Sequence, residues 1–149
     1  MNEPESLSLV FDEGSQEEGP VTCLSPGLYR LGWTPFVAAF EDIEVYFGDV
    51  IEAEPTANGC HRFVRVAERG AFVHDSWVVG PAFLESDYFD DFTTALQGAE
   101  GVWEVLIDGW LLTHIPIGSS FDVGEELFRR RVRALESGVV DALPTADES

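Results

Sequence analysis

Two short stretches combine residue types that enzymes use for catalysis. His74, Asp75 and Ser76 are consecutive, but neighbours on a strand point to opposite faces, so they cannot hydrogen-bond in the order that a catalytic triad needs. Cys60 and His61 are also adjacent, so their side chains would point to opposite faces and could not form a catalytic Cys–His couple. The sequence therefore marks no nucleophile together with its base, and we predict no catalytic residues.

Two carboxylates keep an enzyme reading open. Glu104 and Asp108 stand among bulky apolar residues in "VWEVLIDGWLL". A carboxyl group in an apolar pocket has a raised pKa and can act as a general acid. These two residues are the candidates if the chain is a small hydrolase or a ligand-binding enzyme that uses pocket carboxylates.

Metal ligation has little support in the sequence. The histidines and cysteines lack the short spacings of structural zinc sites. Asp87, Asp90 and Asp91 lack the loop glycine and the terminal Glu of an EF-hand, and helix capping explains them. His114 falls in an apolar hairpin, where a hydrogen-bonded core histidine is more common than a ligand. We predict no metal and no cofactor.

A stretch with six acids runs from residue 41 to residue 54, just before an Asn-Gly turn. Its carboxylates could gather at one edge of the fold and attract a basic partner, or they could be the wet side of a hairpin. The predicted partner-binding residues are Glu41, Asp42, Glu44, Asp49, Glu52 and Glu54.

Turn dipeptides predict the elements that would position these side chains. Ser25-Pro26-Gly27 predicts a hairpin over 21–33, and Asn58-Gly59 predicts a second over 50–66. Counting outward from Asn58-Gly59 pairs Glu52 with Arg65 and Glu54 with Phe63, and Arg65 is then the only base that offsets the acids. Ile51, Ala53, Val64 and Val66 would lie on the other face.

The second half of the chain alternates strands and helices. We predict a strand over 72–80, a helix that Ser86 caps, a hairpin around Asp108-Gly109 and a final helix that Asp122 caps. The hairpin register places Trp103 and His114 on one face. The apolar stripe of the final helix is predicted as Phe121, Leu127, Phe128, Val132 and Leu135. The predicted class is α+β: antiparallel β-hairpins followed by a β-α-β-β-α unit that is ferredoxin-like, with helices on one sheet face.

The length of 149 residues is that of one domain around one core, so we predict a single domain over 1–149. Residues 11–20, "FDEGSQEEGP", have the composition of a flexible acidic loop. Residues 137–149 are small and acidic after a helix stop, and we expect a disordered acidic tail.

Charge limits the partners. There are 28 acids against 8 bases, the formal net charge is −20, and every base is an arginine. Phosphate binding needs a basic footprint, so nucleic acid and anionic membrane are excluded as expected partners. Adaptation to a salty cytoplasm, docking to a basic protein and mimicry of nucleic acid remain as explanations. The acidic N-terminus is unlike a secretory signal, so a cytoplasmic location is expected.

Residues 28–55, "LYRLGWTPFVAAFEDIEVYFGDVIEAEP", resemble an uncharacterised prokaryotic family, domain of unknown function 4265 (DUF4265). The matching positions include Tyr29-Arg30-Leu31, Pro35-Phe36, Gly48-Asp49-Val50 and Glu54, and later the Ile115-Pro116 step. Trp33 and Thr34 depart from the family pattern. The resemblance spans about residues 21–135 and implies a small cytosolic α+β domain with no assigned activity.

Two functions of different class follow. The leading one is a non-enzymatic acidic protein-interaction domain that engages a basic protein partner, for example an immunity-type inhibitor of a toxin. The alternative is the small hydrolase or ligand-binding enzyme. A polar cleft containing Glu104 or Asp108 would favour the enzyme, and a flat acidic face would favour interaction.

Overall fold

The computed structural model describes residues 4–11, 14–36, 43–106 and 109–140 of the chain. They form two compact units, Met1–Ala71 and Phe72–Ser149, which we call unit 1 and unit 2. Each unit has its own cluster of buried apolar side chains. The expectation of one core therefore does not hold. A barrel buries its apolar residues inside itself and a sheet buries them under its helices, so neither unit needs a common core.

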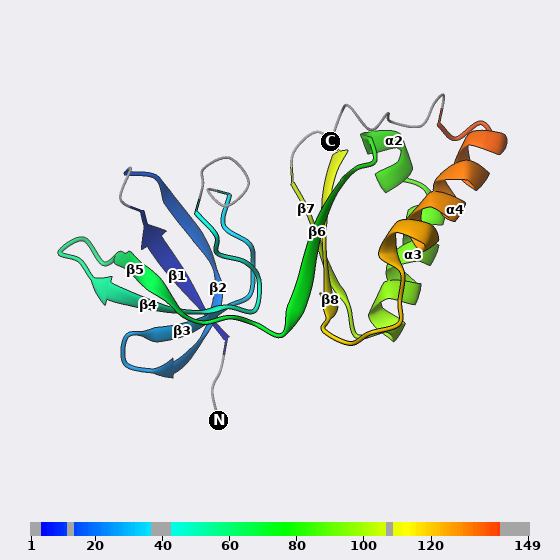
Figure 1. The fold of residues 1–149 in the computed structure, drawn as a ribbon. Coiled ribbons are helices and arrows are strands. Elements are labelled where there is room, and N and C mark those ends of the chain that lie inside the picture. Colours follow the sequence, from blue (N-terminus) through cyan, green and yellow to red (C-terminus); the bar gives the residue numbers. More distant parts are fainter. Residues whose placement is uncertain (1–3, 12–13, 37–42, 107–108, 141–149) are drawn as a thin grey trace. The chain divides into compact units, whose positions relative to one another are not determined.

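Unit 1 is a closed barrel with strand order β1-β2-β3-β4-β5 (Figure 1). The strands are β1 (Pro4–Val10), β2 (Gln16–Ser25), β3 (Leu28–Leu31), β4 (Val50–Pro55) and β5 (His61–Glu68). Successive strands are antiparallel. The barrel closes where β1 runs parallel to β5, at Leu9–His61 and Val10–Arg62. Closure removes the sheet edges and surrounds a core that includes Leu9, Leu31 and Ile51.

The predicted acidic loop over 11–20 is wrong for its second half. Gln16 to Pro20 belong to β2 and pair with β1, from Val10–Gln16 to Ser6–Pro20. Glu18 and its neighbours alternate between exposed and buried positions, which is the period of a strand and not of a free loop. Asp12 and Glu13 lie outside the described residues.

Both hairpins predicted in unit 1 are present, but β-bulges change the second. Glu52–Arg65 and Ile51–Val66 pair as predicted, whereas Glu54 faces Arg62 and Ala53 faces Phe63. The register shifts between Glu52 and Ala53, and this moves Phe63 from the predicted solvent face to the barrel core. A bulge inserts one unpaired residue, so the alternation of faces reverses beyond it.

Unit 2 has the predicted β-α-β-β-α order. Its elements are β6 (Phe72–Val78), α2 (Pro81–Leu84), α3 (Asp87–Gly98), β7 (Val102–Val105), β8 (Trp110–Pro116) and α4 (Val123–Glu136). The sheet order is β6-β8-β7, with β8 antiparallel to both neighbours. The helices cover one face of this sheet (Figure 1). The α+β class and its ferredoxin-like second half are thus confirmed, and α2 is an added turn of helix.

The register of the β7–β8 hairpin differs from the prediction by one residue. Trp103 pairs with Thr113 and Glu104 with Leu112, and Leu106 N–H donates to the carbonyl of Trp110 at 2.7 Å. The predicted two-residue turn at Asp108-Gly109 would have paired Trp103 with His114. Because side chains alternate, the shift places Trp103 and His114 on opposite faces.

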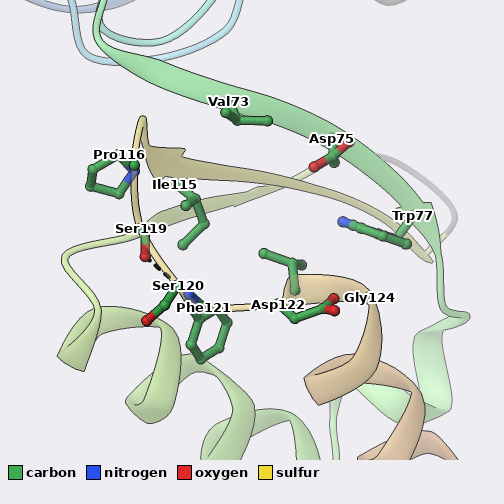
Figure 2. A pocket seen from close by; sticks show the side chains of 12 residues that line it. Val73, Asp75, Trp77, Ile115, Pro116, Ser119, Ser120, Phe121, Asp122 and Gly124 are labelled. Carbon is green, nitrogen blue, oxygen red and sulfur yellow. Dashed lines mark hydrogen bonds between the residues drawn. The ribbon is translucent and has the colours of Figure 1, made fainter.

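The face of the sheet that meets the helices carries one side chain from every second residue. On the edge strand β6 these are Val73, Asp75 and Trp77, which Figure 2 shows pointing toward the helix layer. Trp77 Nε1–H donates to Thr113 Oγ1 at 3.0 Å. Phe89 of α3 meets Trp103 edge to face, with ring centres 5.2 Å apart. The hydrogen bond joins β6 to β8, and the ring contact packs α3 on β7.

The helix caps were predicted correctly. Ser86 Oγ accepts from Phe89 N–H at 3.4 Å, and Asp122 Oδ1 accepts from Glu125 N–H at 3.1 Å. The predicted stripe of α4 is only partly right, because Phe128 is 55% exposed and Leu135 is 37% exposed. The buried face of α4 is formed by Val123, Leu127, Arg130 and Ala134. In the part of the chain that is described, no helix is both long enough and apolar enough to span a bilayer.

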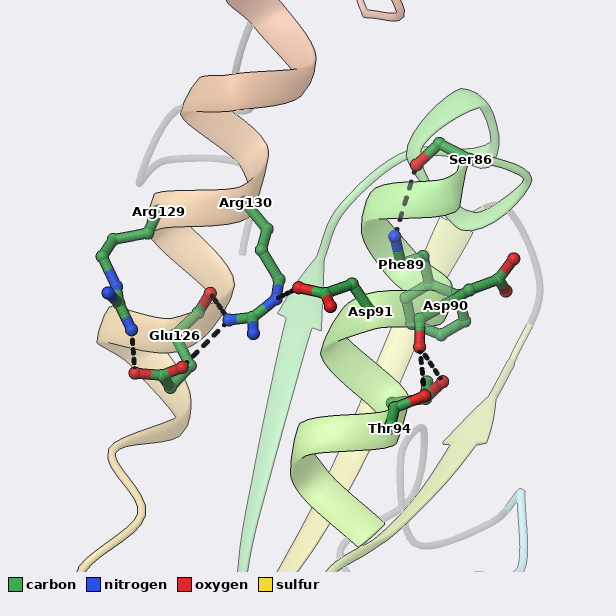
Figure 3. Close-up of polar contacts among 9 residues, drawn as sticks. Ser86, Phe89, Asp90, Asp91, Thr94, Glu126, Arg129 and Arg130 are labelled. Carbon is green, nitrogen blue, oxygen red and sulfur yellow. Dashed lines mark hydrogen bonds and ion pairs between the residues drawn. The ribbon is translucent and has the colours of Figure 1, made fainter. Parts of the chain in front are cut away.

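An arginine stands inside that buried face and ties α4 to α3. Arg130 is 9% exposed. Its Nε donates to Asp91 at 2.8 Å, and its Nη1 donates to Glu126 Oε1 at 3.0 Å and to the Glu126 carbonyl at 2.9 Å (Figure 3). Arg129 also contacts Glu126. The Arg130 hydrogen bond, aided by Arg129, lowers the pKa of Glu126. Burial alone would lower the pKa of Arg130, but its carboxylate partners raise it.

The first four residues of the expected tail are part of the described structure. Ser137 caps α4 and Gly138 has φ 81°, which ends the helix where the sequence placed its stop. Val139 N–H and Val140 N–H both donate to the carbonyl of Ala134, and Val140 packs on the core of unit 2. Residues 137–140 are therefore ordered, and 141–149 lie outside the described residues.

Removing the carboxylate partners of Arg130 should cost more than removing Arg130 itself. Asp91→Ala with Glu126→Ala leaves a buried charge without side-chain partners, and we expect a loss of about 2–4 kcal/mol in unfolding free energy. Arg130→Met keeps the apolar stem and should lose about 1 kcal/mol or less. Urea unfolding followed by far-UV circular dichroism at pH 7 measures both.

The ion pair between Glu126 and Arg130 also makes the unfolding free energy depend on pH. Because folding lowers the pKa of Glu126, its stabilisation is complete above the ordinary Glu pKa of about 4.3 and disappears as pH falls through the lowered value. If the Asp91→Ala, Glu126→Ala double variant and Arg130→Met lost equal unfolding free energy at pH 7, this account of the buried arginine would be contradicted.

Candidate functional site

The six predicted partner-binding carboxylates do not form one exposed patch. Glu44 is exposed, and Glu41 and Asp42 lie outside the described residues. Asp49 is completely buried. It accepts from Tyr46 N–H at 3.0 Å, from Gly70 N–H at 2.8 Å and from Arg69 Nη1 at 2.9 Å. Asp49 is thus a structural anchor of unit 1, and its prediction as a docking residue is wrong.

Arginines also match the two acids on β4. Glu52 Oε1 lies 3.0 Å from Arg65 Nε, and Glu54 Oε2 lies 2.5 Å from Arg62 Nη2. The sequence placed only Arg65 against these acids, because the bulge that turns Arg62 toward Glu54 was not foreseen. Pairs this exposed contribute about 0.2–1 kcal/mol each. Their main effect here is to reduce the net negative charge of this face.

A shallow hollow of about 530 Å³ adjoins these ion pairs. It is lined by the turn Pro26-Gly27-Leu28 and by strand β4 from Glu52 to Pro55, with Arg65 at its side. Both signs of charge border it. Such a surface suits polar docking better than capture of a strongly charged ligand.

The strongest constellation lies in unit 2, on the sheet face away from the helices. His114 on β8 stands between Glu104 on β7 and His74 on β6. Its Nε2 is 2.6 Å from Glu104 Oε2, and its Nδ1 is 2.8 Å from His74 Nδ1. His114 is 1% exposed and the Glu104 side chain is 18% exposed. These three side chains form a continuous hydrogen-bonded row across the sheet, which we call the Glu–His–His row.

The chemistry of the row follows from its hydrogen-bond directions. An ionised Glu104 only accepts, so His114 Nε2–H donates to it. A neutral His114 then offers the lone pair of Nδ1, and His74 Nδ1–H donates to that lone pair. A further proton on His114 Nδ1 would set two N–H groups against each other at 2.8 Å. The row can therefore hold a single proton between its two imidazoles, which is an arrangement that a general base can use.

Sequence reasoning identified Glu104 and His114 separately but did not join them. The buried, hydrogen-bonded state predicted for His114 is confirmed. Its partners were missed because the predicted register put Trp103 on its face in place of Glu104. The alternation in "LLTHIP", in which Leu111, Thr113 and Ile115 take the helix side, was the signal that could have shown it. Asp108, the other candidate, lies outside the described residues.

The remaining candidates have structural roles. Tyr29 Oη lies 3.3 Å from His61 Nε2, and Cys60 Sγ accepts from Gln16 Nε2 at 3.4 Å, so Cys60 and His61 serve different partners. Burial raises the pKa of Tyr29, with Cys23 and Glu5 adding to the effect. Asp87 and Asp90 occupy the first turn of α3. Within the described ranges, no group of three or more His, Cys, Asp or Glu side chains is arranged to hold a metal ion.

Asp49 should matter far more to stability than the acids on β4. Asp49→Ala leaves two backbone N–H groups without their acceptor, and we expect a loss of about 3 kcal/mol, from two charged hydrogen bonds at about 1.5 kcal/mol each. Glu54→Ala, which breaks an exposed pair, should lose about 1 kcal/mol or less. Urea unfolding of both variants tests this, and a loss below 1 kcal/mol for Asp49→Ala would refute the anchoring role.

Comparison with known proteins finds a similar fold in one solved structure. No family model and no curated protein matches the chain. The chain is similar to a solved structure from Neisseria gonorrhoeae, described as the novel crystal structure of a hypothetical protein, with 15% sequence identity and a TM-score of 0.53 over 93% of this chain and 92% of that chain. The resemblance to DUF4265 stays a prediction. At this identity the likeness shows a shared α+β fold over nearly the whole length of both chains.

Proposed function

We propose that this chain is an acidic protein-interaction domain that binds a basic protein partner without catalysing a reaction. An immunity-type inhibitor of a toxin is one concrete form. The proposed compartment is the cytoplasm, which agrees with the free thiols of Cys23 and Cys60. The net charge of −20 favours a cationic partner and disfavours nucleic acid and anionic lipid.

The distribution of unmatched charge carries the proposal. Unit 2 exposes eight carboxylates that have no arginine or histidine nitrogen within 4 Å in the described part of the chain. They are Asp75, Glu85, Asp87, Asp90, Glu100, Asp122, Glu125 and Glu136. On β4, by contrast, both acids have arginine partners. The docking surface is therefore proposed on unit 2, and not on the acidic stretch that the sequence suggested.

Unmatched carboxylates act mainly on the rate and orientation of encounter. They attract a basic partner over roughly a Debye length, about 10 Å at 0.1 M salt. Salt adaptation also explains an acidic surface, but it requires no partner and predicts stabilisation of the fold by salt. Mimicry of nucleic acid would select a phosphate-binding protein as the partner. The test below separates docking from salt adaptation.

Neutralising the acids of unit 2 should slow binding. A partner is first captured from native extract at 50 mM salt and its charge is determined. For a basic partner, Glu85→Gln, Asp90→Asn and Glu125→Gln together should lower the association rate about threefold or more at 50 mM salt and have little effect at 500 mM. Glu44→Gln, Glu52→Gln and Glu54→Gln form the matched control, with an expected change below about twofold. Surface plasmon resonance measures both.

Two results would count against the proposal. Equal association rates for the two triple variants would remove the docking role of unit 2. A melting temperature that rises steeply from dilute buffer to molar KCl, with no basic protein captured, would favour salt adaptation.

The Glu–His–His row favours a second candidate, the small hydrolase. A histidine that is held by a carboxylate through a second imidazole is suited to take a proton from water. Glu104 is the pocket carboxylate that the sequence proposed for this alternative. Its contact with His114 gives Glu104 a chemical partner, although the row does not line the hollow beside β4.

If the row is catalytic, its variants should lose hydrolysis of a simple ester such as p-nitrophenyl acetate. Glu104→Gln and His74→Gln are expected to lower kcat at least 100-fold, as for loss of general-base catalysis. His61→Gln, the matched control in unit 1, should be unaffected. Hydrolysis that is no faster than in buffer, or equal loss in the His61 variant, would remove the enzyme candidate.

A further inference from the structure

A hollow of about 480 Å³ opens beside the edge strand of unit 2. Val73, Asp75 and Trp77 of β6 form one side, and the β8–α4 connection with the start of α4 forms the other, including Phe121 and Asp122 (Figure 2). Its volume is in the range of pockets that hold small ligands or single side chains. The Glu–His–His row lies on the opposite face of the same sheet, so this hollow is a separate site.

The apolar walls are held in place by contacts outside the hollow. The indole Nε1–H of Trp77 is bonded to Thr113 Oγ1, and Thr113 is 1% exposed. Phe121 packs on Phe92 of α3, with ring centres 6.4 Å apart. At Gly124, a side-chain Cβ would lie 3.4 Å from the six-membered ring of Trp77. The glycine thus leaves the start of α4 close to the indole without filling the space beside it.

Both charged side chains that line the hollow are acidic. Asp75 and Asp122 are both exposed, and in the described structure neither has a cation within 4 Å. One carboxylate oxygen of Asp122, Oδ1, accepts a hydrogen bond from Glu125 N–H. The N-terminus of α4 contributes about half a positive charge, which two carboxylates exceed. An anion would therefore be repelled here, and a cation would meet an aromatic ring and two carboxylates.

We propose that this hollow binds an arginine side chain of the basic partner. The guanidinium stacks on the Trp77 indole and donates to the carboxylates of Asp75 and Asp122, while its methylene stem lies along Val73 and Phe121. Arginine fits better than lysine because its planar group stacks on aromatic rings and donates to carboxylates in pairs. This inference rests on the proposed function, since it names the group of the partner that unit 2 recognises.

The site is tested first with a defined probe, N-acetyl-arginine N-methylamide. Titration followed by ¹⁵N NMR of the full chain should shift the Trp77 indole signal, identified with Trp77→Phe, and the amides of residues 119–124. The citrulline counterpart, which has the same shape without the charge, should bind at least tenfold more weakly. Equal binding of the two probes, or shifts confined to other regions, would overturn the site.

A matched pair of variants tests the carboxylates. Asp75→Asn with Asp122→Asn removes both charges, and Asn at 122 still caps α4. This variant should bind the arginine probe at least tenfold more weakly, with an unchanged thermal midpoint. Glu85→Gln with Glu100→Gln removes the same charge away from the hollow and should change probe affinity less than twofold. Equal loss in the two double variants would reduce the site to a general charge effect and overturn it.

The captured partner then separates this inference from the proposed function. If the Asp75 and Asp122 variant loses both the probe and the partner, both stand. If it loses the probe and binds the partner with unchanged affinity, the hollow is not the docking site and the inference fails while the proposed function stands. If no basic partner is captured, the proposed function fails, and the inference that the partner's arginine occupies the hollow fails with it whatever the probe does.

Discussion

Alternation along β8 governs the whole of unit 2. This strand is hydrogen-bonded to β6 on one side and to β7 on the other, so its register decides which side chains of all three strands share a face. Leu111, Thr113 and Ile115 face the helices, and this leaves His114 on the other side. A shift of one residue would exchange the two sets and bury the Glu–His–His row under α3 and α4. The Trp77 wall of the hollow and the Glu–His–His row are therefore two results of one strand pairing.

Unit 1 is organised by a different constraint, the supply of cations. The chain has no lysine and eight arginines, and three of these, Arg62, Arg65 and Arg69, partner acids of the barrel. Arg69 donates to the fully buried carboxylate of Asp49, which also accepts from the backbone N–H groups of Tyr46 and Gly70. A fourth arginine, Arg130, is buried in unit 2, where it binds Asp91 and Glu126. Each unit holds four of the eight arginines, but of the four on α4 only Arg129 and Arg130 pair with carboxylates in the described structure, and eight exposed carboxylates of unit 2 stay unmatched.

Local signals in the sequence predicted most elements of the fold. Turn dipeptides marked the hairpins, Ser86 and Asp122 marked the starts of α3 and α4, and Gly138 marked the end of α4. These features depend on a few neighbouring residues, so a linear reading captures them. The class and the β-α-β-β-α order followed from them. The strand at Gln16–Pro20 was missed because its acidic composition resembles a loop, although β1 pairs with it throughout.

The candidate sites were harder to predict because they depend on register and on distant partners. The Asp108-Gly109 dipeptide suggested a two-residue turn. The register predicted from that turn differs by one residue from the observed one, and it placed Glu104 and His114 on opposite faces of the hairpin. A bulge on β5 at Val64, between the Glu52–Arg65 and Ala53–Phe63 pairs, placed Arg62 and not Phe63 opposite Glu54. Asp49 looked like a surface acid until Gly70 and Arg69, about 20 positions later, supplied its partners. Composition can locate acids, but only tertiary contacts show which of them remain unmatched.

The parallel seam of the barrel has a consequence for the order in which unit 1 is made. Leu9 and Val10 close the barrel against His61 and Arg62, so the outer edge of β1 has no partner until about fifty further residues have left the ribosome. Local hairpins form long before such a distant contact, because closing a long loop costs more entropy than closing a short one. A nascent chain thus carries an open four-strand ribbon or hairpin pair with a bare edge, and the seam is the last part to form.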